Sequence, residues 1–329
     1  MSVATRTYPQ APPALAPQPV RAEERSSSWP LVDRIAMRAC WAAGLLLCVV
    51  AAAILVVMLL KGLEFLRPHL LVERPQADLN QAKSGGFLDP LIGSLLLTVI
   101  GVLVALPIGV GTAVWLTEYG RPAGLARAVE SGVEVVAGTP SIVLAIFGLV
   151  VFQQGIFGFL SFSAQGNAVF GRSFLTAGVM MAFIALPLVV TATREALQSI
   201  PGHVREASYA LGKTKAATIR RVLLPGSRAG IAAGATLGMG RIAGDTAIVV
   251  ILLGASSQLT GQGSVPLLKT LRGTGSTLTS YVYNNSPAGE GNAPGKAYAA
   301  AFVLLLIVIG LNFVVDLISG RKETARWTR

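Results

Sequence analysis

The chain has 329 residues, of which 53% are hydrophobic and only 13% are charged, and its mean hydropathy is +0.63. Soluble domains carry about 25% charged residues, so this composition excludes an ordinary soluble protein. The formal charge of +11 would suggest a nucleic-acid partner for a soluble chain. Here the basic residues gather in the loops on one side of the expected membrane helices, so no nucleic acid is expected.

The apolar residues gather in six blocks. Each is close to or longer than the roughly 20 residues that a helix needs to cross a bilayer. The blocks are Ala39–Leu60, Leu91–Leu116, Val133–Leu160, Leu175–Thr193, Ala229–Gly254 and Ala297–Ser319. The pattern predicts an all-α membrane protein with six transmembrane helices.

The basic residues follow the loops that this topology places on one side. Most of the 27 lie in four segments, which are residues 1–38, 121–127, 194–228 and 321–329. Cytoplasmic loops are enriched in Lys and Arg. We therefore expect a multi-pass protein of the cell membrane with both termini in the cytoplasm.

In chain order, the sequence divides into a tail, an anchor helix and a transmembrane core. The expected segments are a disordered Pro-rich cytoplasmic tail at 1–34, a first transmembrane helix (signal anchor) at 35–62, an outside loop at 63–90, a core at 91–320 and a basic cytoplasmic tail at 321–329. Within the core we expect a short inside loop at 118–130, a polar inside loop at 199–228 and a long outside loop at 255–296.

The chain offers no set of metal ligands or catalytic residues. Cys40 and Cys48 lie eight residues apart on one expected helix, about 12 Å along its axis, which is too far for a disulfide. The two histidines, His69 and His203, are distant from each other. We expect no metal, no catalytic residue and no cofactor bound by this chain.

Glycines recur at every fourth position in the fifth apolar block. Gly230, Gly234 and Gly238 form a stripe of small residues, which lets another helix approach closely. We interpret this stripe as helix packing alone.

The stretch REASYALGKTKAATIRRVLLP (205–225) is polar and basic between apolar blocks. Its GKT tripeptide is not a nucleotide-binding P-loop, because Ala207 stands where that motif needs glycine and the preceding residues read as helix. Gly212 can end a helix in the left-handed conformation, and Thr214 can cap a second helix over Lys215–Leu224. Local signals predict a helix–turn–helix, and on periodicity alone this could be an amphipathic hairpin on the lipid surface.

The spacing of the stretch resembles the EAA loop of ABC-importer permeases. That motif is EAA, three residues, G, nine residues, I-x-LP, and only Ser208 and Val222 depart from it. The matching residues are Glu206, Ala207, Ser208, Gly212, Val222, Leu224 and Pro225. The resemblance implies the type I importer permease fold and assigns these residues to coupling with a separate ATPase subunit.

Four further segments resemble the phosphate-transport permeases of that family, with a lean toward the A-type (PstA-like) subunit. They are AVWLTEYGRP, AGTPSIVLAIFG, LPLVVTATREALQSIP and GMGRIAGDTA, within residues 113–247. One departure is Gly244-Asp245, where the family usually has Gly-Glu. The implied partners are a second permease subunit (PstC-like), a cytoplasmic ATPase dimer (PstB-like) holding ATP and Mg, and an extracytoplasmic phosphate-binding protein (PstS-like).

Two charges lie within the fifth apolar block. Arg241 and Asp245 are four residues apart, so on one continuous helix they would share a face. Ionised groups at membrane depth pair with each other or line a polar pathway. The pair is either a structural ion pair or, with Thr246, part of a substrate pathway; Thr139 and Ser141, on either side of Pro140, are a second candidate lining.

The sequence therefore predicts a permease subunit that imports inorganic phosphate without covalent chemistry of its own. The alternatives are a permease for another oxyanion, such as sulfate, molybdate or a phosphonate, and a membrane scaffold that senses phosphate. A membrane-bound enzyme is disfavoured, because no nucleophile–base pair is visible.

Overall fold

The computed structural model describes residues 29–76, 85–161, 170–254, 259, 270–287, 289 and 293–319. Every regular element in this part is helical. By its internal contacts the chain forms two units, 1–56 and 57–329, and each is described by itself.

Helix α1 (Trp29–Phe65) runs from the first unit into the start of the second. Its side chains from Leu31 to Leu60 are exposed or, at Met58 alone, half-buried, although nearly all of the stretch after Arg38 is apolar. Cys40 and Cys48 are free and exposed on it. The helix begins earlier than the sequence predicted: residues 29–34 belong to α1 rather than to the tail, and residues 1–28 lie outside the described part.

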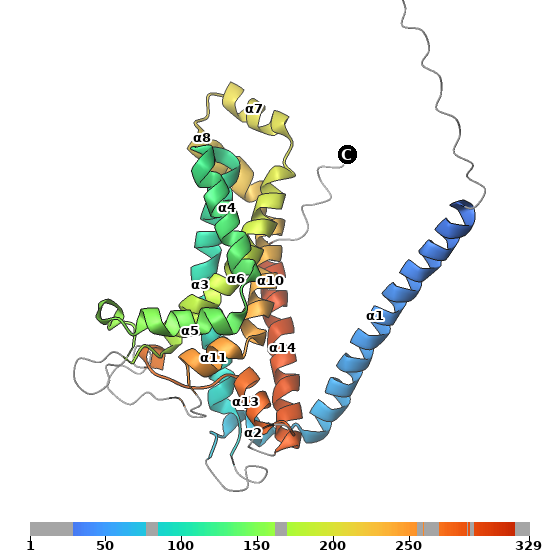
Figure 1. Cartoon of the computed structure of the whole chain (residues 1–329), viewed down its shortest axis with the longest axis vertical. Coiled ribbons are helices and arrows are strands. Elements are labelled where there is room, and N and C mark those ends of the chain that lie inside the picture. The colour runs from blue at the N-terminus through green and yellow to red at the C-terminus, as the bar shows by residue number, and fades with distance from the viewer. Residues whose placement is uncertain are drawn as a thin grey trace, which may run out of the picture. The chain divides into compact units, whose positions relative to one another are not determined.

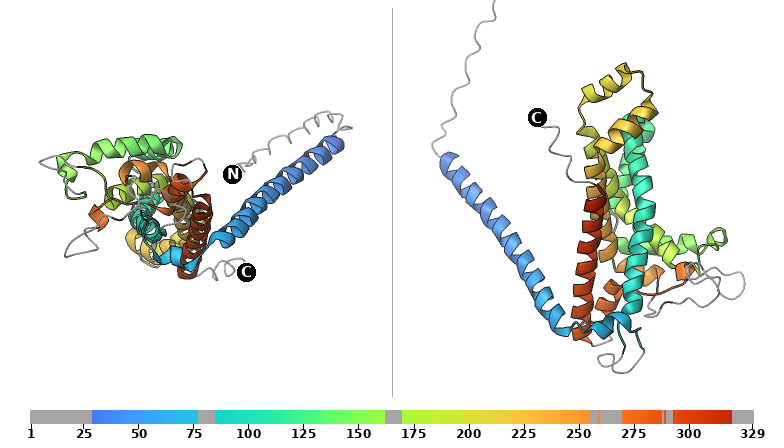
Figure 2. Two further views of the ribbon diagram at one scale, coloured as in Figure 1. Left: turned by 90° about the horizontal axis from the view of Figure 1, so that it is seen from below. Right: turned by 180° about the vertical axis from the view of Figure 1, so that it is seen from behind.

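The core of the second unit is formed by α3 (Leu88–Val114), α6 (Phe174–Gln198) and α10 (Arg228–Gly244). These helices run alongside one another, and α14 (Pro294–Ser319) packs against α10 (Figures 1 and 2). The largest side chains in the centre, including Leu97, Phe174 and Met181, are completely or almost completely buried. Helix α6 is thus the inner helix on which α3 and α10 pack.

The glycine stripe of α10 faces α6, as the sequence predicted. A Cβ added at Gly230 would collide with Ala196, and one added at Gly234 would lie 3.1 Å from the Val189 Cα. Small residues on both sides therefore let the two backbones come together, which in lipid stabilises helix pairs through dispersion contacts.

Two of the predicted apolar blocks are broken in the structure. Helices α4 (Ala123–Gly138) and α5 (Ser141–Phe152) meet at an angle of 110° around Pro140. Helix α10 ends at Gly244 and is followed by the short α11 (Ala247–Leu252), which packs against α5. Helix α4 also occupies most of the 118–130 segment that was predicted to be an inside loop.

Four described helices are long and apolar enough to cross a membrane, and the bent α4–α5 pair would supply a fifth crossing. They correspond to five of the six predicted blocks. The remaining block, 229–254, is divided between α10 and α11, so the fifth predicted helix is not one continuous span. The chain is a multi-pass helical membrane protein.

Short helices occupy parts of the two segments predicted to be outside loops. Helix α2 (Pro68–Val72) lies in the first, and α13 (Leu278–Asn285) lies in the second. Both are at the end of the bundle opposite α7 and α8 (Figure 1). A 3-10 turn, Gly155–Phe157, follows α5. Residues 77–84, most of 255–269 and the tail at 321–329 lie outside the described part.

The α6–α10 contact predicts a position-dependent effect of alanine within one helix. Gly240 has no atom within 4 Å of an added Cβ, whereas Gly230 meets Ala196. Both changes gain helix propensity of about 1 kcal/mol, so their difference reports packing. We expect Gly230→Ala to lower the thermal unfolding temperature in detergent and Gly240→Ala to leave it unchanged or raise it. Equal effects would show that the contact is unimportant.

Candidate functional site

The 199–228 segment, called here the coupling loop, folds as the local signals predicted. Helix α7 (Gly202–Ala210) is followed by Gly212 at φ +73°, and α8 (Lys215–Thr218) then begins. The Thr214 Oγ1 accepts a hydrogen bond from the Ala217 N–H at 3.3 Å and caps α8. The loop lies at one end of the bundle (Figure 1).

The second helix of the loop differs from the prediction in its details. A π-helical turn, η3 (Ile219–Leu223), follows α8, and α9 (Leu224–Gly226) continues from it. Pro225 is the second residue of α9 and lies directly after the π-helical turn. Pro201 is the N-cap residue of α7.

Ser208 joins the two arms of the coupling loop. Its hydroxyl lies 2.9 Å from the Thr218 hydroxyl, and both side chains are buried. An alanine here could not make this bond. The departure of this chain from the EAA pattern therefore has a structural role: it ties α7 to α8.

The remaining motif residues fall into two groups. Glu206, Ala207 and Gly212 are exposed, whereas Val222, Leu224 and Pro225 are half-buried on the side of the bundle. Two apolar side chains beside the motif are also exposed, Tyr209 at 43% and Leu211 at 78%. The loop thus presents an apolar surface beyond the ends of the membrane helices.

Arg205 fixes the start of α7 to the ends of two membrane helices. Its Nε donates to a carboxylate oxygen of Glu118 at 3.1 Å, and its two terminal nitrogens donate to the Ile200 and Leu197 carbonyls at 2.7 and 2.8 Å. The Glu118 side chain is 7% exposed and that of Arg205 is 22% exposed. Glu118 lies in the π-helical turn η1 (Trp115–Tyr119) that ends α3.

Lys215 makes a second connection from the loop to the same turn. Its ammonium donates to the Glu118 carbonyl and lies 4.6 Å from the centre of the Tyr119 ring. Both arms of the coupling loop are therefore held on residues 118–119. We call the contact of Arg205 with Glu118 the Arg205–Glu118 clamp. Sequence reasoning missed this clamp, because its partners are separated by 87 positions.

Thr139 and Ser141 lie at the break between α4 and α5. The Thr139 hydroxyl donates to the Val135 carbonyl at 2.6 Å, which partners a carbonyl that the break would otherwise leave open. Ser141 is the first residue of α5, and both side chains are half-buried. Both residues therefore belong to a break in a membrane helix, where polar groups are needed.

Arg241 and Asp245 do not form the predicted pair on one helix. Helix α10 ends at Gly244, and Asp245 has extended backbone angles, φ −80° and ψ 128°. The buried Asp245 carboxylate accepts a hydrogen bond from the Ile248 N–H at 3.0 Å, so it caps α11. Arg241 is exposed, and no ion pair joins these two described residues. The interpretation as an ion pair that fixes the register of one helix is wrong, because α10 ends before Asp245 and the Asp245 carboxylate caps α11.

The two breaks belong to helices that contact each other. Helix α11 packs against α5, and Ala145, Ile248 and Val249 share one buried cluster. Thr246 is half-buried at the start of α11. The structure therefore brings the elements carrying Thr139, Ser141, Asp245 and Thr246 together, with Arg241 on the last turn of α10.

Residues 105–324 match the model of a family described as "Binding-protein-dependent transport system inner membrane component". The chain belongs to this family. The matched range contains the coupling loop and both helix breaks, so the geometry above belongs to a transport component.

Individual relatives agree with this assignment. The phosphate transport system permease protein PstC of Mycobacterium leprae is 32% identical over 250 residues, covering 72% of this chain and 76% of the relative. PstA 1 of Mycobacterium tuberculosis strain H37Rv is also 32% identical, over 71% of this chain and 70% of the relative. Both subunit types thus match equally well, and the lean toward the A-type stays a prediction.

The fold of the chain is also found in solved transporters. A chain from the bacterial ABC transporter involved in the import of the acidic polysaccharide alginate aligns with a TM-score of 0.57 and 15% identity. The alignment covers 90% of this chain and 100% of that chain. The type I importer permease fold that the resemblance implied is therefore observed.

The clamp predicts a measurable loosening of the coupling loop in this transport component. Glu118→Gln leaves the Arg205 guanidinium without its carboxylate in a largely buried place, which costs several kcal/mol in comparable pairs. We expect amide hydrogen exchange in α7 to rise at least about tenfold, since 1.4 kcal/mol corresponds to a factor of ten.

The matched control for the clamp is Glu130→Gln. It breaks the more exposed Arg194–Glu130 pair, whose side chains are 37% and 33% exposed and which lies between α6 and α4. Pairs of that kind contribute about 1 kcal/mol or less. Exchange in α7 that rises equally in both variants would contradict a specific role for Glu118.

Proposed function

We propose that this chain is a permease subunit of an ABC importer that moves inorganic phosphate into the cell. The coupling loop carries the proposal: a motif of fixed spacing forms an exposed helical hairpin that is held on two membrane helices. The named relatives support phosphate as the substrate, because they are phosphate transport system permease proteins.

In the proposed mechanism, α7 docks on a separate cytoplasmic ATPase subunit. Exposed Tyr209 and Leu211 need covering, since large apolar side chains in water favour association. Ala207 leaves room for close approach of a partner. When the ATPase dimer closes on ATP, the Arg205–Glu118 clamp would pass its displacement to α3 and α6.

The proposed assembly has four kinds of subunit. This chain pairs with a second permease subunit, rests on the cytoplasmic ATPase dimer and receives phosphate from an extracytoplasmic binding protein. Docking on the ATPase requires that the coupling loop be cytoplasmic. The end of the bundle that carries α2 and α13 then faces the outside, and both termini lie in the cytoplasm, in accord with the distribution of basic residues.

Arg241 is the proposed attractor for the anion. Its side chain is exposed in the single chain and follows the apolar stretch Leu237–Gly240 of α10. An arginine at membrane depth faces either another protein chain or a water-filled cavity. Broken helices line substrate sites in many transporters, because their free backbone groups bind the substrate. We place the pathway beside Arg241, Asp245 and Thr246, with Thr139 and Ser141 on the neighbouring break.

The decisive experiment reconstitutes the chain with its co-purifying partners in liposomes and compares ATP-dependent uptake of radiolabelled phosphate and sulfate. We expect phosphate uptake that sulfate does not compete away. Arg241→Gln should abolish it at normal assembly, whereas Arg127→Gln, which removes an exposed arginine from α4, should not. Preferential sulfate uptake would identify another oxyanion importer, and an assembled complex without uptake would favour the phosphate-sensing scaffold.

A second experiment tests the coupling role of the loop. Gly212 has φ +73° and open space around its Cα, so a β-branched residue there is strained by its backbone alone. We expect Gly212→Val to uncouple ATP hydrolysis from uptake in an inserted, assembled complex. Gly202→Val adds the same side chain in open space at an ordinary helical φ and should retain uptake. Normal uptake by Gly212→Val would refute the coupling role.

A further inference from the structure

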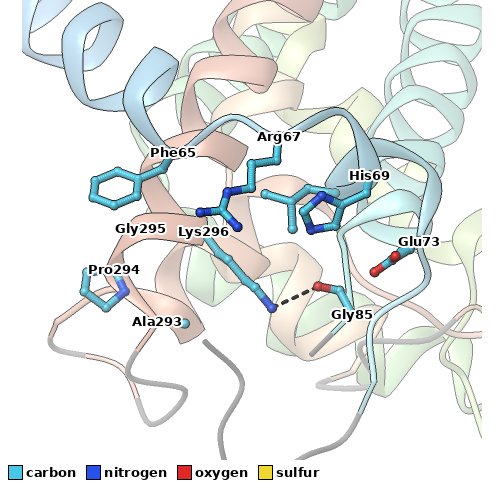
Figure 3. A pocket seen from close by; sticks show the side chains of 10 residues that line it. Phe65, Arg67, His69, Glu73, Gly85, Ala293, Pro294, Gly295 and Lys296 are labelled. Atoms are coloured by element: carbon cyan, nitrogen blue, oxygen red, sulfur yellow. Dashed lines mark hydrogen bonds between the residues drawn. The ribbon is translucent and has the colours of Figure 1, made fainter. Parts of the chain in front are cut away.

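A cavity of about 560 Å³ opens at the end of the bundle opposite the coupling loop (Figure 3). Its walls come from the last turn of α1, from α2 and from the first turn of α14. Its lining residues are Phe65, Arg67, His69, Leu70, Glu73, Gly85, Ala293, Pro294, Gly295 and Lys296. None of these residues belongs to the coupling loop or to the helix breaks.

Close backbone contacts hold the walls of the cavity together. Gly62 and Gly295 have no room for a Cβ, because Phe302 and Phe65 lie against them, so the end of α1 is packed on α14. The Phe87 N–H donates to the Leu70 carbonyl at 2.8 Å, which joins α2 to the segment before α3. The end of α1 is therefore fixed against α14, and α2 is fixed against the segment before α3.

Three basic side chains face this cavity, against one acidic side chain among the described lining residues. Figure 3 shows Arg67, His69 and Lys296 around the same opening, with Glu73 beside His69. Lys296 is only 8% exposed, and its ammonium donates to the Gly85 carbonyl at 2.9 Å. A lysine held in this way brings a fixed positive charge to the floor of the cavity.

The cavity lies at the level where two membrane spans end. The apolar stretch of α1 stops at Leu60 and is followed by the charged Lys61 and Glu64, and α14 becomes apolar only from Ala297. Side chains at such a level meet the phosphate groups of the lipids rather than the hydrocarbon. Phe65, Leu70 and Pro294 supply an apolar wall beside the charges.

We propose that this cavity binds an anionic phosphate group. Arginine and lysine give short, charge-assisted hydrogen bonds to phosphate oxygens, and the guanidinium of Arg67 can bind two of them at once. The group can come from a phospholipid headgroup, whose glycerol would lie on the apolar wall, or from free inorganic phosphate. The proposal does not depend on the transport function proposed above.

The test uses the assembled complex, stripped of lipid in a neutral detergent. Its thermal unfolding is measured against increasing phosphatidylglycerol, phosphatidylcholine or inorganic phosphate. Arg67→Gln/His69→Gln is compared with the wild type, and Lys61→Gln serves as the control because Lys61 is exposed outside the cavity and pairs with Glu64. Phosphatidylcholine, which has no net charge, reports stabilisation by any lipid.

We expect one anionic probe to raise the unfolding temperature of the wild type and of Lys61→Gln. The double variant should need at least about ten times more of that probe for half of the shift, since the guanidinium of Arg67 and the ring N–H donor of His69 are both lost. A response to phosphatidylglycerol identifies a lipid site, and a response to inorganic phosphate identifies a site for the free ion. If the double variant does not assemble, the same titration is carried out with Arg67→Gln alone, and we expect it also to need more of the probe than the wild type.

Two results would overturn the proposal. One is the absence of any shift with either anionic probe, and the other is an equal shift in the wild type, the double variant and the control. Phosphate bound in the transport pathway would shift all three proteins alike, so it cannot imitate the expected difference. If the reconstituted complex did not take up phosphate, the expected difference between the wild type and the double variant in this binding test would be unchanged.

Discussion

A backbone N–H or carbonyl without a partner costs several kcal/mol in hydrocarbon, and this cost shapes the membrane part of the chain. Two helices are interrupted, and at each break side chains take over the missing bonds. Thr139 partners the Val135 carbonyl, and Asp245 partners the Ile248 N–H. Thr139 and Asp245 are therefore needed to complete the backbone hydrogen bonds at the breaks, whether or not they also bind a substrate. A substrate pathway beside the breaks would be lined by side chains that these hydrogen bonds already hold in place.

The packing around α6 explains how such interrupted helices stay together. Small residues on α6 and α10 bring their backbones into contact, and α3 packs on another side of α6. Arg205 then joins the end of α6 to α7 and, through Glu118, to the end of α3. A displacement of α7 therefore acts on two membrane helices that are already packed together, which a loop joined only by its own chain could not do.

Local signals in the sequence predicted the coupling loop well, because Gly212, Thr214 and the apolar spacing act within a few residues. They failed at the breaks, since one proline or aspartate changes the hydropathy of a long apolar block very little. The predicted pairing of Arg241 with Asp245 assumed that one helix continues through both residues. Helix α10 ends between them, and Asp245 caps α11 instead. The Arg205–Glu118 clamp and the cavity around Lys296 join positions far apart in the chain, for which a single sequence holds no signal.

Helix α1 is longer than a bilayer is thick. Its 37 residues extend about 55 Å, whereas the apolar stretch between Arg38 and Lys61 is matched to the roughly 30 Å of hydrocarbon. These two charges fix the depth of the helix, because moving either inward costs about 2.5–3.5 kcal/mol. The residues of α1 before Arg38, which include Asp33 and Arg34, therefore add about 13 Å of helix beyond the length that the hydrocarbon requires.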